Sequence, residues 1–124
     1  MKKNYPVTEI ERSVATDQII ISSTDTKGAI RSVNADFIDI SGFTEEELIG
    51  KNHNIVRHPD MPPGAFENLW KTLKQGRPWM GIVKNRCKNG DYYWVDAYVT
   101  PMLEKGTIVG YESTRVRASA EDIR

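Results

Sequence analysis

Residues 78–94 read PWMGIVKNRCKNGDYYW, two runs of alternating character on either side of a tight turn. An Asn-Gly pair flanked by alternating apolar residues is the strongest short-range signal for a β-hairpin, and here it falls at Asn89-Gly90. The strand after this turn is followed by a second turn, and residues 107–117 then resume a strand pattern. We therefore expect three consecutive antiparallel strands in the second half of the chain.

The first half of the chain predicts another hairpin followed by short helices. Residues 18–24 and 29–33 are rich in β-branched side chains and flank a turn. Helical spacing or helix-capping signals then occur over 34–42, 44–50 and 63–75, with a proline-broken segment before the last of these. The sequence thus predicts an α+β fold, a five-stranded antiparallel sheet with a short-helix insertion between strands 2 and 3 covering one face.

The two ends of the chain lie outside this pattern, which covers residues 18–117. Residues 1–17 form an N-terminal cap segment, where Thr8 and Glu11 have the spacing of a capping box and predict a short helix. Residues 118–124 begin the pattern of a further capped helix. We therefore expect the natural protein to continue through a C-terminal linker or helix.

Composition excludes several classes of protein. The 124 residues are one domain's length, and 17 Lys+Arg balance 17 Asp+Glu, which removes the field that draws a chain onto nucleic acid or anionic lipid. No run approaches the roughly 18 apolar residues of a spanning helix, and none resembles a signal peptide. A single cysteine precludes an intramolecular disulfide. We expect a cytoplasmic domain with no nucleic-acid partner and no membrane contact of its own.

Alternation along residues 79–87 divides this strand between two faces. Lys84 belongs to the outward set, so the inward set is Trp79, Gly81, Val83, Asn85 and Cys87. Asn85 is then a buried amide, which needs hydrogen-bond partners from a ligand or from backbone at a bulge. Gly81 leaves space for a planar ligand or marks a bulge, and Trp79 either stacks on the ligand or fills the core.

On the last strand, Arg115 and Arg117 are expected to face water. Glu112 shares parity with Thr114 and Val116, and the residues alone leave open whether it faces the interior.

The proline-broken segment contains two histidines and an aspartate, His53, His58 and Asp60. These are metal-ligand types, but no regular spacing brings them together, so a metal site is not expected. Taken alone, the segment is typical of an exposed loop with a local ion pair. No nucleophile, base and orienting group are recognisable together either, so the sequence does not predict an enzyme.

Several runs together closely resemble a PAS domain over residues 18–117. They are Asn34-Ala35-x-Phe37, Ser41-Gly42-Phe43-Thr44, Glu46-Glu47-Leu48-Ile49-Gly50-Lys51, and Lys88-Asn89-Gly90 before a Tyr-Trp strand. Three further runs resemble the sensing domain of the aerotaxis-receptor family: Asn54-x-Val56-Arg57-His58-Pro59-Asp60-Met61-Pro62, Pro78-Trp79-x-Gly81-Ile82-Val83-Lys84-Asn85-Arg86 and Pro101-Met102.

This resemblance implies the PAS fold, with FAD held noncovalently between the sheet and its helices. The redox state of the flavin would be the signal. The resemblance also implies that the polypeptide continues into a membrane anchor and into downstream signal-relay and chemoreceptor signalling domains, and that the full-length protein is a homodimer.

Roles for individual residues follow from the same resemblance. Asn85 would contact the pyrimidine edge of the flavin, whose adjacent carbonyl and N–H groups match an amide. Arg57 and His58 would bind the pyrophosphate, and Asp60 would orient them or bind ribose. Asn34 would cap a helix, contact the flavin, or do both.

For two residues, His53 and Trp79, the sequence leaves two roles open. His53 would stack on adenine or lie on the surface, and Trp79 would stack near the ring system or fill the core.

The sequence differs from LOV photoreceptors at positions needed for their light-driven adduct chemistry. Cys87 lies on a strand, the helical segment that carries the adduct-forming cysteine in LOV relatives has none, and Val95 faces inward where a second asparagine is expected. Light-driven adduct chemistry is therefore disfavoured. Two alternatives to a flavin sensor stay open at this point, a heme-binding PAS gas sensor with His58 or His53 as axial ligand, and a cofactor-free PAS dimerisation module.

Overall fold

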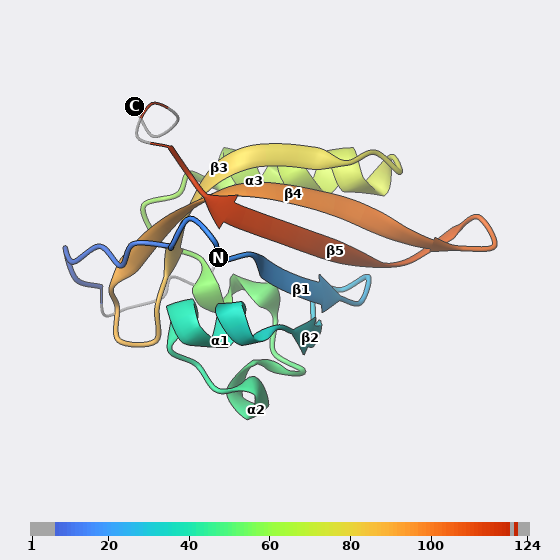
Figure 1. Cartoon of the computed structure of the whole chain (residues 1–124). Helices are drawn as coiled ribbons and strands as arrows, with labels where there is room; N and C mark the ends of the chain where they lie inside the picture. Colours follow the sequence, from blue (N-terminus) through green and yellow to red (C-terminus); the bar gives the residue numbers. More distant parts are fainter. Residues whose placement is uncertain (1–6, 120, 122–124) are drawn as a thin grey trace.

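A computed structural model describes residues 7–119 and residue 121. Five strands form one antiparallel sheet in the order β2-β1-β5-β4-β3 (Figure 1). The strands are β1 (Ile20–Thr24), β2 (Ile30–Val33), β3 (Trp79–Arg86), β4 (Tyr92–Glu104) and β5 (Thr107–Arg117). The helices between β2 and β3 are α1 (Ala35–Ser41), α2 (Glu45–Leu48), the 3-10 helix η1 (His53–Val56) and α3 (Pro63–Lys74). The predicted order of elements is confirmed.

Local signals in the sequence set the boundaries of the short helices. The Asn34 side chain accepts from the backbone N–H of Phe37 at the start of α1, and Gly42 ends that helix in the left-handed conformation at φ 77°. At α2, Thr44 and Glu47 form a complete capping box. The chain therefore turns sharply twice between β2 and η1.

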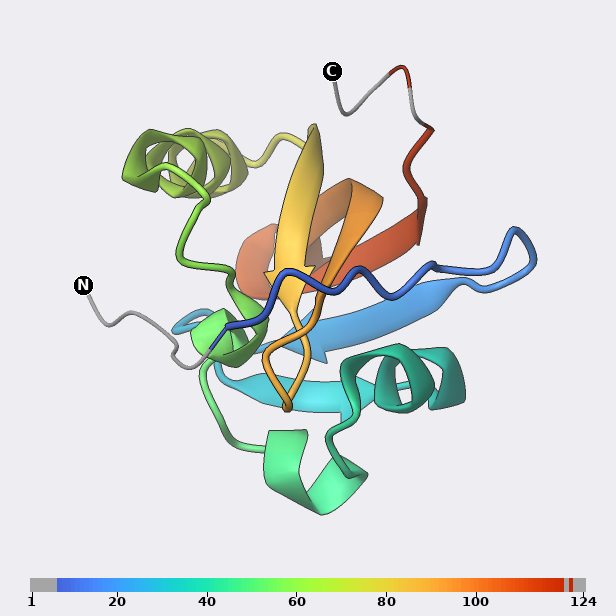
Figure 2. The same ribbon diagram turned by 90° about the vertical axis from the view of Figure 1, so that its left-hand side faces the viewer.

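The helices divide between the two ends of the sheet. α1 contacts β1 and α2 contacts β2, whereas α3 contacts β3 and β4. Figure 2 shows the same separation from the side, with α3 next to β3 and with α1 and α2 grouped near β2. η1 contacts β3 and links the two groups.

The core has two parts that follow this division. The larger part lies beneath α1 and α2 and includes Phe37, Ile40, Leu48, Val56, Tyr93 and Val95. The smaller part, formed by Leu73, Val99 and Tyr111, lies beneath α3. Trp79 packs against both parts. Since neither part extends under the whole sheet, space is left between them.

The predicted parity of β3 is confirmed at its buried positions, because Val83, Asn85 and Cys87 are all less than a tenth exposed. Val95 also faces inward, as expected, and is fully buried. The outward set is less open to solvent than its parity implied, since Arg86 is 8% exposed.

The helix predicted within the N-terminal segment is wrong over the described residues. The Thr8 hydroxyl donates to the Asp91 carboxylate at 2.6 Å and accepts from the backbone N–H of Ile10 at 3.1 Å, and no helix follows it. The backbone from residue 8 to residue 12 instead hydrogen-bonds to Gly90 and Tyr92 in the β3–β4 hairpin. Glu11 forms an isolated parallel bridge with Tyr92, in the part of β4 that extends beyond the end of β5. The helix expected after residue 118 lies largely outside the described residues.

The expectation that Arg115 faces water is wrong as well. On β5 the side chains of Tyr111, Ser113 and Arg115 are buried beneath the sheet, whereas Glu112 is exposed. The aromatic side chain of Tyr111 sets this parity, because it packs on Trp70 of α3 with ring centroids 5.4 Å apart. Arg117 is exposed, as expected. Among the described residues, no helix is long and apolar enough to cross a membrane.

Candidate functional site

A cavity of about 680 Å³ occupies the space between the two parts of the core. Its floor is the inner face of the sheet, and η1 and α3 form the opposite wall. The apolar walls come from Val83, Ala97 and Val99 on one side and from Phe66, Leu69 and Trp70 on the other. Ligand pockets in proteins commonly have volumes of about 300–1,000 Å³ and apolar walls with a few convergent polar groups.

A polar cluster of three side chains lines part of the cavity. The Arg115 guanidinium donates from Nη2 to Ser22 Oγ at 2.7 Å, and its Nη1 lies 3.0 Å from His53 Nε2. Ser22 Oγ lies 3.1 Å from the same His53 nitrogen. Because a guanidinium only donates, His53 Nε2 accepts and the ring proton of neutral His53 is on Nδ1. We call Arg115, Ser22 and His53 the inner polar cluster.

Electrostatics keep this cluster at a single positive charge. Burial and the adjacent guanidinium lower the pKa of His53 to about 3, so its imidazole is neutral near pH 7. Burial lowers the pKa of Arg115 to about 10, which leaves it protonated. No carboxylate in the described chain forms an ion pair with Arg115, and its Nε has no hydrogen-bond partner there.

Asn85 and Arg57 both line the cavity and come together at the open edge of the sheet. Their backbones form an isolated antiparallel bridge, so the chain after η1 runs alongside β3. The Asn85 side chain is 5% exposed, and the Arg57 guanidinium lies 4.0 Å from the centre of the Phe66 ring on α3. An amide and a cation therefore face the cavity from the same edge.

Trp79 also lines the cavity, at the junction of the two core parts. Its indole N–H donates to the Asn68 side chain of α3 at 2.9 Å. The indole also covers Gly81, where a Cβ atom would collide with it. The space that Gly81 was expected to leave for a ligand is therefore occupied by the protein's own Trp79, which connects β3 to α3.

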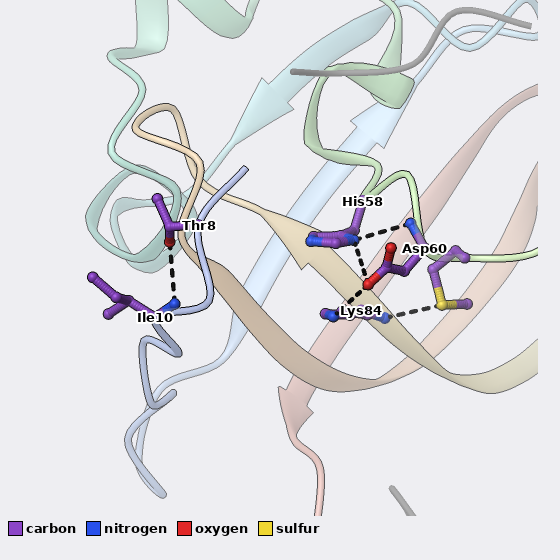
Figure 3. A network of polar contacts seen from close by, with 6 residues as sticks. Thr8, Ile10, His58, Asp60 and Lys84 are labelled. Carbon is purple, nitrogen blue, oxygen red and sulfur yellow. Dashed lines mark hydrogen bonds and ion pairs between the residues drawn. The ribbon is translucent and has the colours of Figure 1, made fainter. Parts of the chain in front are cut away.

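His58 and Asp60 are absent from the residues that line the cavity. His58 is 2% exposed, its Nδ1 accepts from the backbone N–H of Asp60 at 3.0 Å, and its ring packs edge-on against Tyr92. The Asp60 carboxylate receives a 3.0 Å hydrogen bond from Lys84 on β3 (Figure 3). Both residues connect the chain between η1 and α3 to the sheet. Of Arg57, His58 and Asp60, only Arg57 lines the cavity.

Asn34 is likewise not among the cavity residues. Its amide oxygen accepts from the backbone N–H groups of Ile21 and Phe37, and its amide nitrogen donates to the carbonyl of Ile19. The helix-capping role is therefore confirmed, and the hydrogen bonds at both ends of the amide are made to the protein.

The sequence reasoning missed Ser22 and Arg115. Ser22 lies on β1 directly after Ile21, and its parity with buried Ile20 and Thr24 was the available signal. For Arg115 the signal was Tyr111. The two residues are four positions apart on one strand, so they share a face, and a large aromatic residue indicates the buried face.

The Cys87 thiol is not among the groups that line the cavity. Burial raises the pKa of the Cys87 thiol to about 11, and its sulfur donates to the carbonyl of Ile40. The described residues contain no cluster of three or more His, Cys, Asp or Glu side chains that could hold a metal ion.

The fold, with a cavity between the sheet and its helices, is that of a known protein family. Residues 30–115 match the family model described as PAS fold, so this chain belongs to the PAS family. A blue-light photoreceptor LOV domain, in the structure titled "The dark structure of the blue-light photoreceptor Aureochrome1 LOV", shares this fold. Its TM-score is 0.75 at 19% identity over 82% of this chain and 77% of that chain.

Within the family, the chain is similar to the aerotaxis receptor of Escherichia coli (strain K12). The two are 51% identical over 123 residues, which is 99% of this chain and 24% of the receptor. The nitrogen fixation regulatory protein of Klebsiella pneumoniae is 31% identical over 85 residues, 68% of this chain and 17% of that protein. The chain thus spans a quarter or less of the length of these relatives.

Proposed function

We propose that this chain is the flavin-binding sensory domain of an aerotaxis receptor, and that it holds FAD in the cavity between the sheet and α3. The observation that carries the proposal is the cavity itself, which has apolar walls and a buried guanidinium that has no counter-charge and one unpartnered N–H in the described chain. A planar ring system with hydrogen-bond acceptors on one edge suits both features. The similarity to the aerotaxis receptor over nearly the whole chain supports the same assignment.

The polar and apolar groups of the cavity fit the edge and the faces of such a ring. Asn85 offers a donor and an acceptor on one amide, which matches the adjacent carbonyl and N–H groups on a flavin's pyrimidine edge. Arg115 of the inner polar cluster and the Asn85 amide both interact with Tyr93, so the cluster supplies further donors near the same amide. The apolar side chains of β4 and α3 would then enclose the faces of the ring and exclude water.

The charges around the cavity support FAD rather than a neutral flavin. Four basic residues and one acidic residue line it in the described chain: Lys27, Arg57, Lys74, Arg115 and Glu67. A pyrophosphate carries the complementary negative charge and accepts hydrogen bonds from Arg and Lys. We propose that Arg57 is the principal pyrophosphate ligand, with His58 and Asp60 holding its backbone in place from outside the cavity.

Flavin supplies reversible electron transfer when bound, and the protein would perform no turnover. The residues that contact the ring would respond to its change in charge and protonation, because rotation of the Asn85 amide exchanges a donor for an acceptor. The sheet would convey this change to downstream signalling domains of the same polypeptide. Coupling of about 1–3 kcal/mol is enough to bias a two-state output. We place this domain on the cytoplasmic side of a homodimeric receptor.

The heme alternative has less support from the geometry. His58 does not line the cavity, and His53 Nε2 already accepts from Arg115 and Ser22. A heme would need a histidine nitrogen directed at its iron.

Titration of the ligand-free protein with FAD, FMN and riboflavin, followed by flavin fluorescence, tests the proposal. We expect FAD to bind most tightly, and we expect Arg57→Gln to weaken FAD more than riboflavin. Glu104→Gln, an exposed change at the end of β4, is the control and should leave all three affinities unchanged. Failure of all three flavins to bind would contradict a flavin site, and equal affinity for FAD and riboflavin would contradict the pyrophosphate role.

A further inference from the structure

Arg115 is a buried cation, and the described side chains that contact it are all neutral. Its side chain is 3% exposed, and the groups nearest to it are Ser22, His53, Tyr93 and the ring of Phe37, which lies 4.9 Å away. Burial raises the pKa of Tyr93 and lowers that of His53, so neither carries a charge near neutral pH. A buried charge normally has a paired counter-charge, because removing an ion from water without one is costly.

The hydrogen bonds of Arg115 are also incomplete. A guanidinium has five N–H donors, and Nε is buried with no partner in the described chain. Arg115 lines the cavity, so a molecule in the cavity can reach these donors. The missing partner must be an acceptor, and its negative charge would offset the cost of burying the cation.

We propose that Arg115 is the built-in counter-charge of the bound ring: it donates to a carbonyl on the ring's electron-rich edge and stabilises the negative charge that the ring gains on reduction. This inference rests on the proposed flavin site. Each electron that the ring accepts without a proton adds one negative charge to it. Because opposite charges attract strongly where water is excluded, a cation in contact with the ring favours the reduced form.

The same residue also connects the ring to two separate elements. Arg115 is on β5, Ser22 is on β1 and His53 begins η1. Because the guanidinium is rigid and planar, a shift of its Nε toward a reduced ring would also move Nη1 and Nη2, and so would alter the bonds to His53 and Ser22. The charge of the ring is therefore felt at the β1–β5 pairing and at the start of η1.

A reductive titration of the holoprotein, with dithionite as the electron donor and redox dyes as mediators, tests this role. We expect Arg115→Gln to lower the equilibrium constant for addition of the first electron about tenfold or more, which is a fall of about 59 mV or more in midpoint potential. Arg115→Lys keeps the charge, so its midpoint potential should lie between those of the natural sequence and Arg115→Gln. Arg117→Gln removes an exposed charge from the same strand and should leave the potential unchanged.

An Arg115→Gln holoprotein with the potential of the natural sequence would overturn the inference while leaving the flavin site intact. A natural-sequence protein that binds no flavin would overturn both. If the variants do not fold, the infrared carbonyl stretches of bound FAD labelled with ¹³C at C2 or C4 answer the question without them. We expect one carbonyl stretch to be lowered by the guanidinium, and stretches matching those of flavin in a dry aprotic solvent would contradict the contact.

Discussion

Replacement of His58 by alanine separates its structural role from direct ligand binding. The imidazole is 2% exposed, accepts from the Asp60 backbone N–H at 3.0 Å and packs against Tyr92. Its loss removes one buried hydrogen bond, worth about 1 kcal/mol, and an aromatic contact worth about 0.5–1.5 kcal/mol. With the space left behind, we expect His58→Ala to destabilise the ligand-free protein by about 2–4 kcal/mol.

Arg57→Gln is the matched comparison from the adjacent residue. The Arg57 side chain faces the cavity, and its contact with the Phe66 ring is worth about 0.5–1 kcal/mol at an exposed site. We therefore expect this variant to retain nearly all of the stability of the ligand-free protein while losing affinity for FAD. Asp60→Asn breaks an exposed ion pair with Lys84, which should cost less than about 1 kcal/mol.

Urea unfolding of ligand-free protein at pH 8, followed by circular dichroism, measures these differences, and FAD titration of the same samples measures affinity. At pH 8 the comparison involves neutral His58, since burial lowers its pKa. If His58→Ala unfolds at the same urea concentration as the natural sequence but binds FAD tenfold more weakly, the structural role assigned to His58 is refuted.

Three further expectations follow from the geometry. Gly110→Ala should destabilise the protein by about 2 kcal/mol or more in a thermal melt, because a Cβ there meets the backbone carbonyl of Thr24 across the β1–β5 pair; an unchanged melting temperature would show that β1 can shift. Asn85→Ala should reduce the flavin content of purified protein severalfold or shift its potential, and a variant with neither change would remove Asn85 from the site. The pKa of His53 is lowered to about 3, so the unfolded chain binds a proton near pH 6.5 that the folded chain refuses. Stability should thus fall by up to about 1.4 kcal/mol per pH unit as the pH drops below 6.5. His53→Gln should reduce this slope in urea titrations between pH 7.5 and pH 4.5, whereas a slope unaltered by the substitution would contradict the buried neutral histidine.

The order of elements was predictable because each boundary has a local cause. Thr44 and Glu47 cap α2 through groups three residues apart, and Gly42 supplies the left-handed residue that ends α1. The alternation that turned Asn85 and Val95 inward is likewise a property of the strand itself. For these features, a short stretch of sequence carries the information.

The inner polar cluster could not be predicted in this way, since its members come from three distant parts of the chain. Arg115 and Ser22 are 93 positions apart and meet only because β5 pairs with β1. Residue type was misleading as well, because arginine is mostly exposed in proteins. A similar limit applies to His58, whose position next to Arg57 in the sequence gave no indication that Arg57 lines the cavity while His58 packs against Tyr92 outside it.

The helix predicted in the N-terminal segment was wrong for a different reason. The spacing of Thr8 and Glu11 is that of a capping box, but the Thr8 hydroxyl donates to the side chain of Asp91, 83 positions away, and ties the segment to the β3–β4 hairpin. Pairing with Tyr92 then satisfies the backbone of this segment more completely than one isolated helical turn would. Tertiary contacts here override a local signal.

The absorption spectrum of the purified natural-sequence protein, with mass analysis of the ligand released on denaturation, tests the flavin assignment most directly. We expect the paired near-ultraviolet and blue bands of an oxidised flavin and a released mass equal to that of FAD. A single intense heme band would contradict the assignment. A spectrum with only protein absorption that persists after incubation with FAD would contradict it equally.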